Sequence, residues 1–89
     1  MIAGKVVGSV ISTRKSGKLV GNKFMIIEPC ENMRGVGERL VAIDPIGAGI
    51  GEYVLVATGS AARIGSGMDM APIDAAVVGI IDDPSDLGL

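Results

Sequence analysis

The sequence predicts a mostly β protein: a small five-stranded barrel similar to an OB-fold, with one short helix. Five short segments are rich in β-branched residues, which favour a pleated, largely buried backbone. Glycine, proline or polar residues separate these segments, as in compact Greek-key barrels. A chain of 89 residues has room for one domain. We therefore predict a single barrel domain over residues 1–82, followed by a tail over residues 83–89.

The first two strands are predicted over Ile2 to Thr13 and Lys23 to Glu28. Two glycines interrupt the first, as in a long strand that bends around a barrel. The polar stretch Arg14 to Lys18 must turn, and we interpret it as a solvated hairpin loop rather than a basic contact site. Pro29 cannot donate a hydrogen bond to a ladder, so the second strand is expected to stop there.

The central stretch of the chain reads as strand, glycine loop, strand. The third strand is predicted over Arg39 to Asp44 and the fourth over Glu52 to Thr58. Between them Gly47, Gly49 and Gly51 alternate with larger residues, so the backbone can adopt positive φ and another part of the assembly can approach it closely. This loop is a candidate contact region.

The residues after the fourth strand predict a capped turn. Gly59 ends the strand, Ser60 is a good N-cap, and Ala61 to Arg63 have high helix propensity. One or two helical turns are expected to begin at Ser60. The segment Gly65 to Met70 is too rich in glycine for an assignment.

The fifth strand is predicted over Ala75 to Asp82, and it is apolar on both faces. A strand of an antiparallel barrel usually points one face towards water. With 48% hydrophobic residues, the chain also has more apolar side chain than a small barrel can easily enclose. We therefore expect the outer face of this strand to contact another subunit.

Composition excludes several classes of partner and compartment. The net charge is −2 and the pI is about 4.9, so no global field attracts nucleic acid or an anionic membrane. A lone cysteine cannot form an intramolecular disulfide, which fits a cytoplasmic protein. No apolar run suits a signal peptide or a membrane span, so neither secretion by that route nor membrane insertion is expected.

The sequence predicts no enzyme, no metal site and no cofactor. Histidine is absent, and Cys30 alone cannot build a thiolate site or act as an activated nucleophile, so we interpret it as a structural thiol. The acidic pairs Asp69/Asp74 and Asp82/Asp83 lie among turn residues and are expected to be solvated. The run G-A-G-I-G leads into a strand rather than a helix, which disfavours a phosphate loop.

A resemblance rests on these same residues. The stretch D-x-x-G-A-G-x-G-E-x-V-L-V-x-x-G-S-A-A-R, from Asp44 to Arg63, resembles the signature of the EutN/CcmL family, the pentameric vertex proteins of bacterial microcompartment shells. Gly4-x-Val6-x-Gly8 resembles the family's opening strand, and Pro72 to Ile80 its closing strand. Cys30-Glu31 and the tail depart from the pattern.

The resemblance implies a structural homopentamer that caps the vertices of a polyhedral shell in the cytoplasm, beside hexameric shell proteins. Together with the residue analysis it gives a set of candidates for the subunit interface or the ring axis. The candidates are Gly47, Ala48, Gly49, Gly51, Glu52, Ser60, Arg63, Val77 and Val78.

The alternative from another class is a small oligomeric OB-like module that binds nucleic acid or a nucleotide. Such surfaces stack bases on aromatic side chains in a basic groove. This chain has only Phe24 and Tyr53 as aromatic residues and a negative net charge, so nucleic-acid binding is not expected. A sizing measurement together with a nucleic-acid binding assay would discriminate the two hypotheses, and a genomic neighbourhood that encodes shell hexamers and encapsulated enzymes would favour the first.

Overall fold

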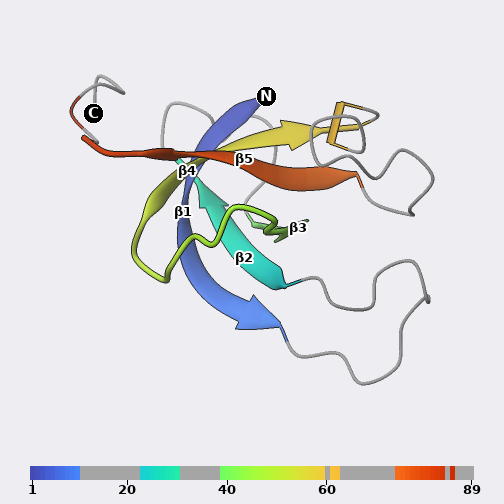
Figure 1. Ribbon diagram of the computed structural model, residues 1–89, viewed down its shortest axis with the longest axis horizontal. Coiled ribbons are helices and arrows are strands. Elements are labelled where there is room, and N and C mark those ends of the chain that lie inside the picture. The colour runs from blue at the N-terminus through green and yellow to red at the C-terminus, as the bar shows by residue number, and fades with distance from the viewer. Residues whose placement is uncertain (11–22, 31–38, 60, 63–73, 84, 86–89) are drawn as a thin grey trace.

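A computed structural model of the chain contains the five predicted strands (Figure 1). The structure describes residues 1–10, 23–30, 39–59, 61–62, 74–83 and 85. The strands are β1 (Ile2–Val10), β2 (Phe24–Pro29), β3 (Leu40–Ile43), β4 (Tyr53–Thr58) and β5 (Ala75–Ile81). The expected extension of the first strand to Thr13 and the loop Arg14 to Lys18 lie outside the described residues, as does the segment Gly65 to Met70.

The strands close into a barrel in the order β1-β2-β3-β5-β4, which confirms the predicted fold class. All neighbouring pairs are antiparallel except β3 and β5, which meet in parallel through Ile43 and Ala76. β1 curves along both β2 and β4, with a register shift between Val6 and Gly8 on the β2 side. A sheet closed in this way has no free edge, which removes a route to edge-to-edge aggregation.

β2 ends at Pro29, as expected, although the proline itself still belongs to the strand. It is the last residue of the strand and lies opposite Gly4 of β1, and its side chain is fully buried. The backbone N–H of Cys30, one residue later, donates to the carbonyl oxygen of Ala3 at 3.0 Å. Proline lacks only its own donor, so the next residue restores the contact with β1.

One apolar cluster fills the inside of the barrel. It draws on every strand and consists of Ile2, Val6, Met25, Ile27, Ala42, Ala48, Val54, Val56, Ala75 and Val77, with Leu40 and Ile80 packed against it. The contributing positions alternate along β2 and β4, as the two-residue period of a strand requires.

The outer face of β5 is covered in part by the chain itself. Ala76 belongs to a second, smaller cluster with Ile43 and Ala62, against which Phe24 packs. The start of β5 is therefore buried on both faces within one chain, and the expected contact of the outer face with another subunit stays a prediction. From Val78 to Ile81 the strand is half-buried, and this part has surface left for another subunit.

Ala61 and Ala62 are helical, as predicted, and the Ala62 N–H donates to the Gly59 carbonyl oxygen at 3.1 Å. Ser60 and Arg63 lie outside the described residues, so the cap and the length of the turn stay predictions. Among the described residues no helix is long and apolar enough to span a membrane.

The division into a domain over 1–82 and a tail over 83–89 also stays a prediction. Of the tail the structure describes Asp83 and Ser85. The Ser85 N–H and hydroxyl both donate to Asp83 Oδ1, at 3.0 and 2.8 Å, and these bonds lower the pKa of the Asp83 carboxyl.

The barrel predicts a sharp cost for a side chain at Gly4. A Cβ there would lie 2.6 Å from Ile27 Cγ2 and 2.9 Å from the Glu28 carbonyl oxygen, so backbone would have to move. We expect Gly4→Ala to lower the free energy of unfolding by about 1–3 kcal/mol, as overpacking does. Chemical denaturation at fixed chain concentration measures this.

Gly8→Ala is the matched control, because its Cβ would meet only the flexible end of Ile26 at 3.4 Å. We expect a much smaller change for this variant. Equal losses of stability in the two variants would contradict the close approach of β1 and β2 at Gly4.

Candidate subunit interface

The glycine loop, residues 44–52, connects β3 to β4 and contains most of the candidate interface residues (yellow-green in Figure 1). Gly47 has φ 98° and Gly51 has φ 94°, so both need the left-handed region that glycine alone enters freely. A Cβ built on either would find nothing within 4 Å among the described residues. The positive φ requires glycine at both positions, and the described residues leave space beside each of them.

Asp44 fixes the first half of the loop. Its Oδ1 accepts hydrogen bonds from the backbone N–H of Ile46 at 3.1 Å and of Gly47 at 2.9 Å. An aspartate that bonds amides two and three residues ahead holds a turn in place of a backbone carbonyl. The side chain is fully buried, and Oδ2 has no hydrogen-bond partner within the part of the chain that the structure describes, but it lies 3.9 Å from the Lys23 ammonium.

Glu52 and β1 fix the second half. The Gly49 N–H donates to Glu52 Oε1 at 2.6 Å, and the Glu52 N–H donates to the Gly49 carbonyl at 3.1 Å. Gly51 N–H donates to the Val6 carbonyl at 2.8 Å, while the Val6 N–H donates to the Glu52 carbonyl at 2.9 Å. The loop is thus tied to itself and to the barrel wall.

Two candidate residues point into the barrel rather than towards a neighbour. Ala48 is 1% exposed and Val77 is 0% exposed, and both belong to the main core. This corrects their assignment, because side chains enclosed by their own chain have no surface to offer another subunit. Val78 is half-buried, one residue after Val77, near the register shift between Leu55 and Val56.

The outer face of β1, β4 and β5 includes apolar surface that the sequence analysis did not single out. Lys5, Tyr53 and Ile81 lie opposite one another on the three strands, and the Lys5 ammonium lies 5.8 Å from the centre of the Tyr53 ring. In the adjoining row Leu55 packs over Gly79 and remains 38% exposed. Alternation along β4 is the sequence signal for an outward-facing Leu55, but only the register brings these residues together.

The chemistry of the loop does not suit an anion. Its backbone donors at Ile46, Gly47 and Gly49 are bonded to carboxylates, and that of Gly51 to a carbonyl. A phosphate loop needs free amides and a positive field. The described residues also contain no group of three side chains that could hold a metal ion.

Comparisons with known proteins agree on one family. The sequence model of the family described as "Ethanolamine utilisation protein EutN/carboxysome" matches residues 1–82. The chain is 46% identical over 83 residues to the "Bacterial microcompartment shell vertex protein GrpN" of Rhodospirillum rubrum (strain F11), covering 92% of this chain and 93% of that protein. It is 47% identical over 83 residues to the "Carboxysome shell vertex protein CcmL" of Synechocystis sp. (strain ATCC 27184 / PCC 6803 / Kazusa), covering 92% and 83%.

Solved structures give the same result. The structure described as "GrpN pentameric microcompartment shell protein from Rhodospirillum rubrum" superposes with a TM-score of 0.79 at 42% identity, covering 93% of this chain and 96% of that one.

The loop geometry predicts different effects of two substitutions at Asp44. Asp44→Ala leaves the Ile46 and Gly47 donors without their acceptor, and we expect a loss of about 1–3 kcal/mol in the free energy of unfolding. Asp44→Asn keeps an acceptor oxygen in the same place, so its loss should be clearly smaller. Denaturant titration of both variants checks this, and an equal loss would show that the two hydrogen bonds do not anchor the loop.

The burial of Cys30 predicts a thiol that reacts slowly with alkylating reagents. Cys30 is 6% exposed, and its burial raises the pKa of the thiol, so little thiolate forms at neutral pH. We expect native Cys30 to react far more slowly with iodoacetamide at pH 8 than the same chain in denaturant. Mass spectrometry over time measures both rates; comparable rates would contradict a buried, structural cysteine.

Proposed function

The chain belongs to the EutN/CcmL family, and we propose that it is a structural vertex protein of a bacterial microcompartment shell, assembled as a homopentamer. The observation that carries this proposal is similarity over more than nine tenths of the chain to a shell vertex protein whose structure is described as pentameric. The barrel itself is compatible with many functions. Sequence similarity that spans the whole barrel is what favours this one.

The proposed location is the shell of a microcompartment within the bacterial cytoplasm, as for the vertex proteins GrpN, CcmL and EutN. A polyhedral shell also needs subunits for its facets, and we propose hexameric shell proteins as the neighbours of the pentamer. Co-expression with such hexamers, followed by co-purification, tests this partner separately from the pentamer itself.

We further propose that the protein has no catalytic activity. Asp74 precedes β5 and Asp82 follows it, so these two exposed carboxylates lie at opposite ends of the strand. The thiol of Cys30 is buried. Catalytic groups need a shared cleft and tuned pKa values. The relatives are named as shell vertex proteins, which supports the same proposal.

The alternative, an OB-like module for nucleic acid or a nucleotide, gains no support from the loop. Its carboxylates Asp44 and Glu52 occupy the amides that would face a phosphate. Lys5 stacks on the single tyrosine, so that ring is already partly covered. We therefore keep the shell function as the single proposal.

Within the pentamer, we place the subunit contact on the glycine loop and on the half-buried part of β5. Gly47, Gly49 and Gly51 are exposed and have no Cβ, which allows a second backbone to approach. Val78 and the neighbouring Leu55 and Ile81 offer apolar surface on the same side of the sheet pair β4–β5. Ser60 and Arg63 remain proposed members of this interface on sequence grounds.

Two adjacent valines give a direct test of assembly. Wild-type protein should show the mass of five chains in native mass spectrometry. Val78→Lys places a charge in the proposed contact, where an unpaired buried charge costs several kcal/mol, and should give folded single chains. Val77→Lys instead puts the charge inside the barrel and should unfold the protein, as circular dichroism would show.

Ser9→Lys is the matched control, because Ser9 is exposed on β1 and lies away from the proposed contact. It should remain pentameric. A wild-type monomer at micromolar concentration would contradict the proposed function, whereas a pentameric Val78→Lys would contradict only the position of the interface.

A further inference from the structure

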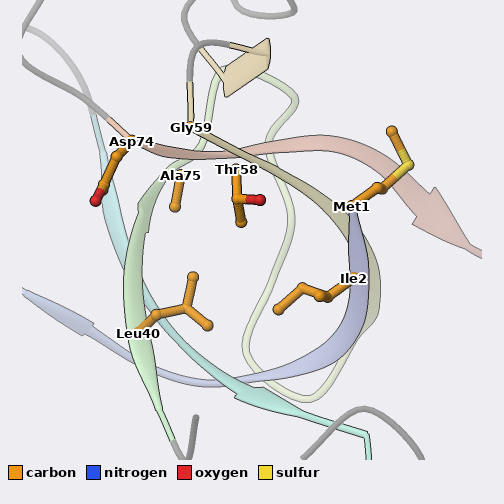
Figure 2. Close-up of a pocket in the computed structure, with 7 residues that line it drawn as sticks. All are labelled: Met1, Ile2, Leu40, Thr58, Gly59, Asp74 and Ala75. Carbon is orange, nitrogen blue, oxygen red and sulfur yellow. The ribbon is translucent and has the colours of Figure 1, made fainter. Parts of the chain in front are cut away.

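A pocket opens at the end of the barrel where β1, β3 and β5 begin and β4 ends (Figure 2). It has a volume of about 400 Å³. Met1, Ile2, Leu40 and Ala75 form its apolar part, and Thr58 brings a hydroxyl to it. Asp74 lies at its edge, with the side chain pointing outwards. Pockets that receive a ligand or a partner's side chains typically combine an apolar wall with a few polar groups in this way.

Asp74 carries a charge that the described part of the chain does not neutralise. Its backbone carbonyl accepts from the Gly59 N–H at 2.7 Å, which fixes the residue at the rim. Its side chain is exposed and has no ion-pair partner among the residues that the structure describes. An unpaired carboxylate beside an apolar wall suits a partner group that is both positively charged and aliphatic.

The other end of the same strands carries such a group. β4 runs from Tyr53, opposite Lys5, to Thr58 at the pocket. Lys5 is exposed, and within the described part of the chain no carboxylate pairs with it. Ile50, 66% exposed, lies close by, because the next residue, Gly51, bonds the Val6 carbonyl. The nearest loop carboxylate, Glu52, is engaged with Gly49.

A closed ring of identical subunits needs two different surfaces on each subunit that fit each other. From the proposed pentamer and these two ends, we infer a head-to-tail contact between copies of this chain. Ile50 of one copy packs against the apolar wall of the next copy's pocket, and Lys5 approaches Asp74. The contact covers Ile50, the more exposed of the two isoleucines in the glycine loop, and pairs two charges that have no ion-pair partner among the described residues.

The inference rests on the proposed function and is tested by cysteine cross-linking. In a Cys30→Ala background, Ile50→Cys combined with Leu40→Cys should form disulfides between neighbouring copies. Mild oxidation should then give a ladder of up to five linked chains on a non-reducing gel. Ile50→Cys combined with Ser9→Cys is the matched control and should give no ladder.

Charge substitution tests the Lys5–Asp74 pair. Asp74→Lys and Lys5→Glu should each raise the chain concentration needed for half-assembly by about tenfold, the effect of ~1.4 kcal/mol, and the double variant should recover most of that loss. Asp82→Asn, which removes a carboxylate next to the end of β5, is the control and should not weaken assembly.

The outcomes separate the two proposals. If the wild-type chain is pentameric but the Ile50→Cys/Leu40→Cys variant forms no ladder, the head-to-tail contact is wrong and the vertex function is unaffected. The same conclusion follows if the double charge reversal assembles no better than the single variants. A wild-type chain that does not assemble at all overturns both.

Discussion

The barrel depends on the hydrogen bonds that the buried Asp44 carboxylate accepts from the amides of Ile46 and Gly47. β3 has β2 on one side and β5 on the other, so the chain cannot turn back beside β3 to begin β4. It must instead cross to the side of β1. The Asp44 turn begins this crossing, and Ala48 in its middle packs into the core. The crossing ends where the Gly51 N–H donates to the Val6 carbonyl oxygen.

The same anchoring explains why a glycine-rich loop here has a structural role. Glycine permits positive φ, but it also leaves amides free to bind anions, and phosphate loops use both properties. In this chain Asp44 and Glu52 accept hydrogen bonds from those amides. Transferring a carboxylate from water into the protein interior is costly unless hydrogen bonds and a nearby cation compensate. The Lys23 ammonium lies 3.9 Å from Asp44 Oδ2. The two carboxylates therefore make the loop a rigid surface element.

Sequence patterns predicted the strands and the positions that need glycine, because both depend on local preferences. They did not predict which β5 valine points inwards. Ala75 and Val77 lie in the core, and the register shift between Leu55 and Val56 then turns Ile80 rather than Gly79 towards it. Nor did they predict that Ala48, in a loop, would fill the barrel. Such assignments depend on how distant segments meet, which local preference does not encode.

Small size links assembly to stability in this protein. A domain of this length buries only about 60–65% of the surface of its unfolded chain, and the structure leaves Ile46, Ile50 and Leu55 substantially exposed. Covering such side chains in a ring adds apolar burial that a single barrel lacks. Because binding to the folded state stabilises it by mass action, the stability of each barrel should increase with chain concentration. The free energy of unfolding of an assembled chain is then larger than that of an isolated chain.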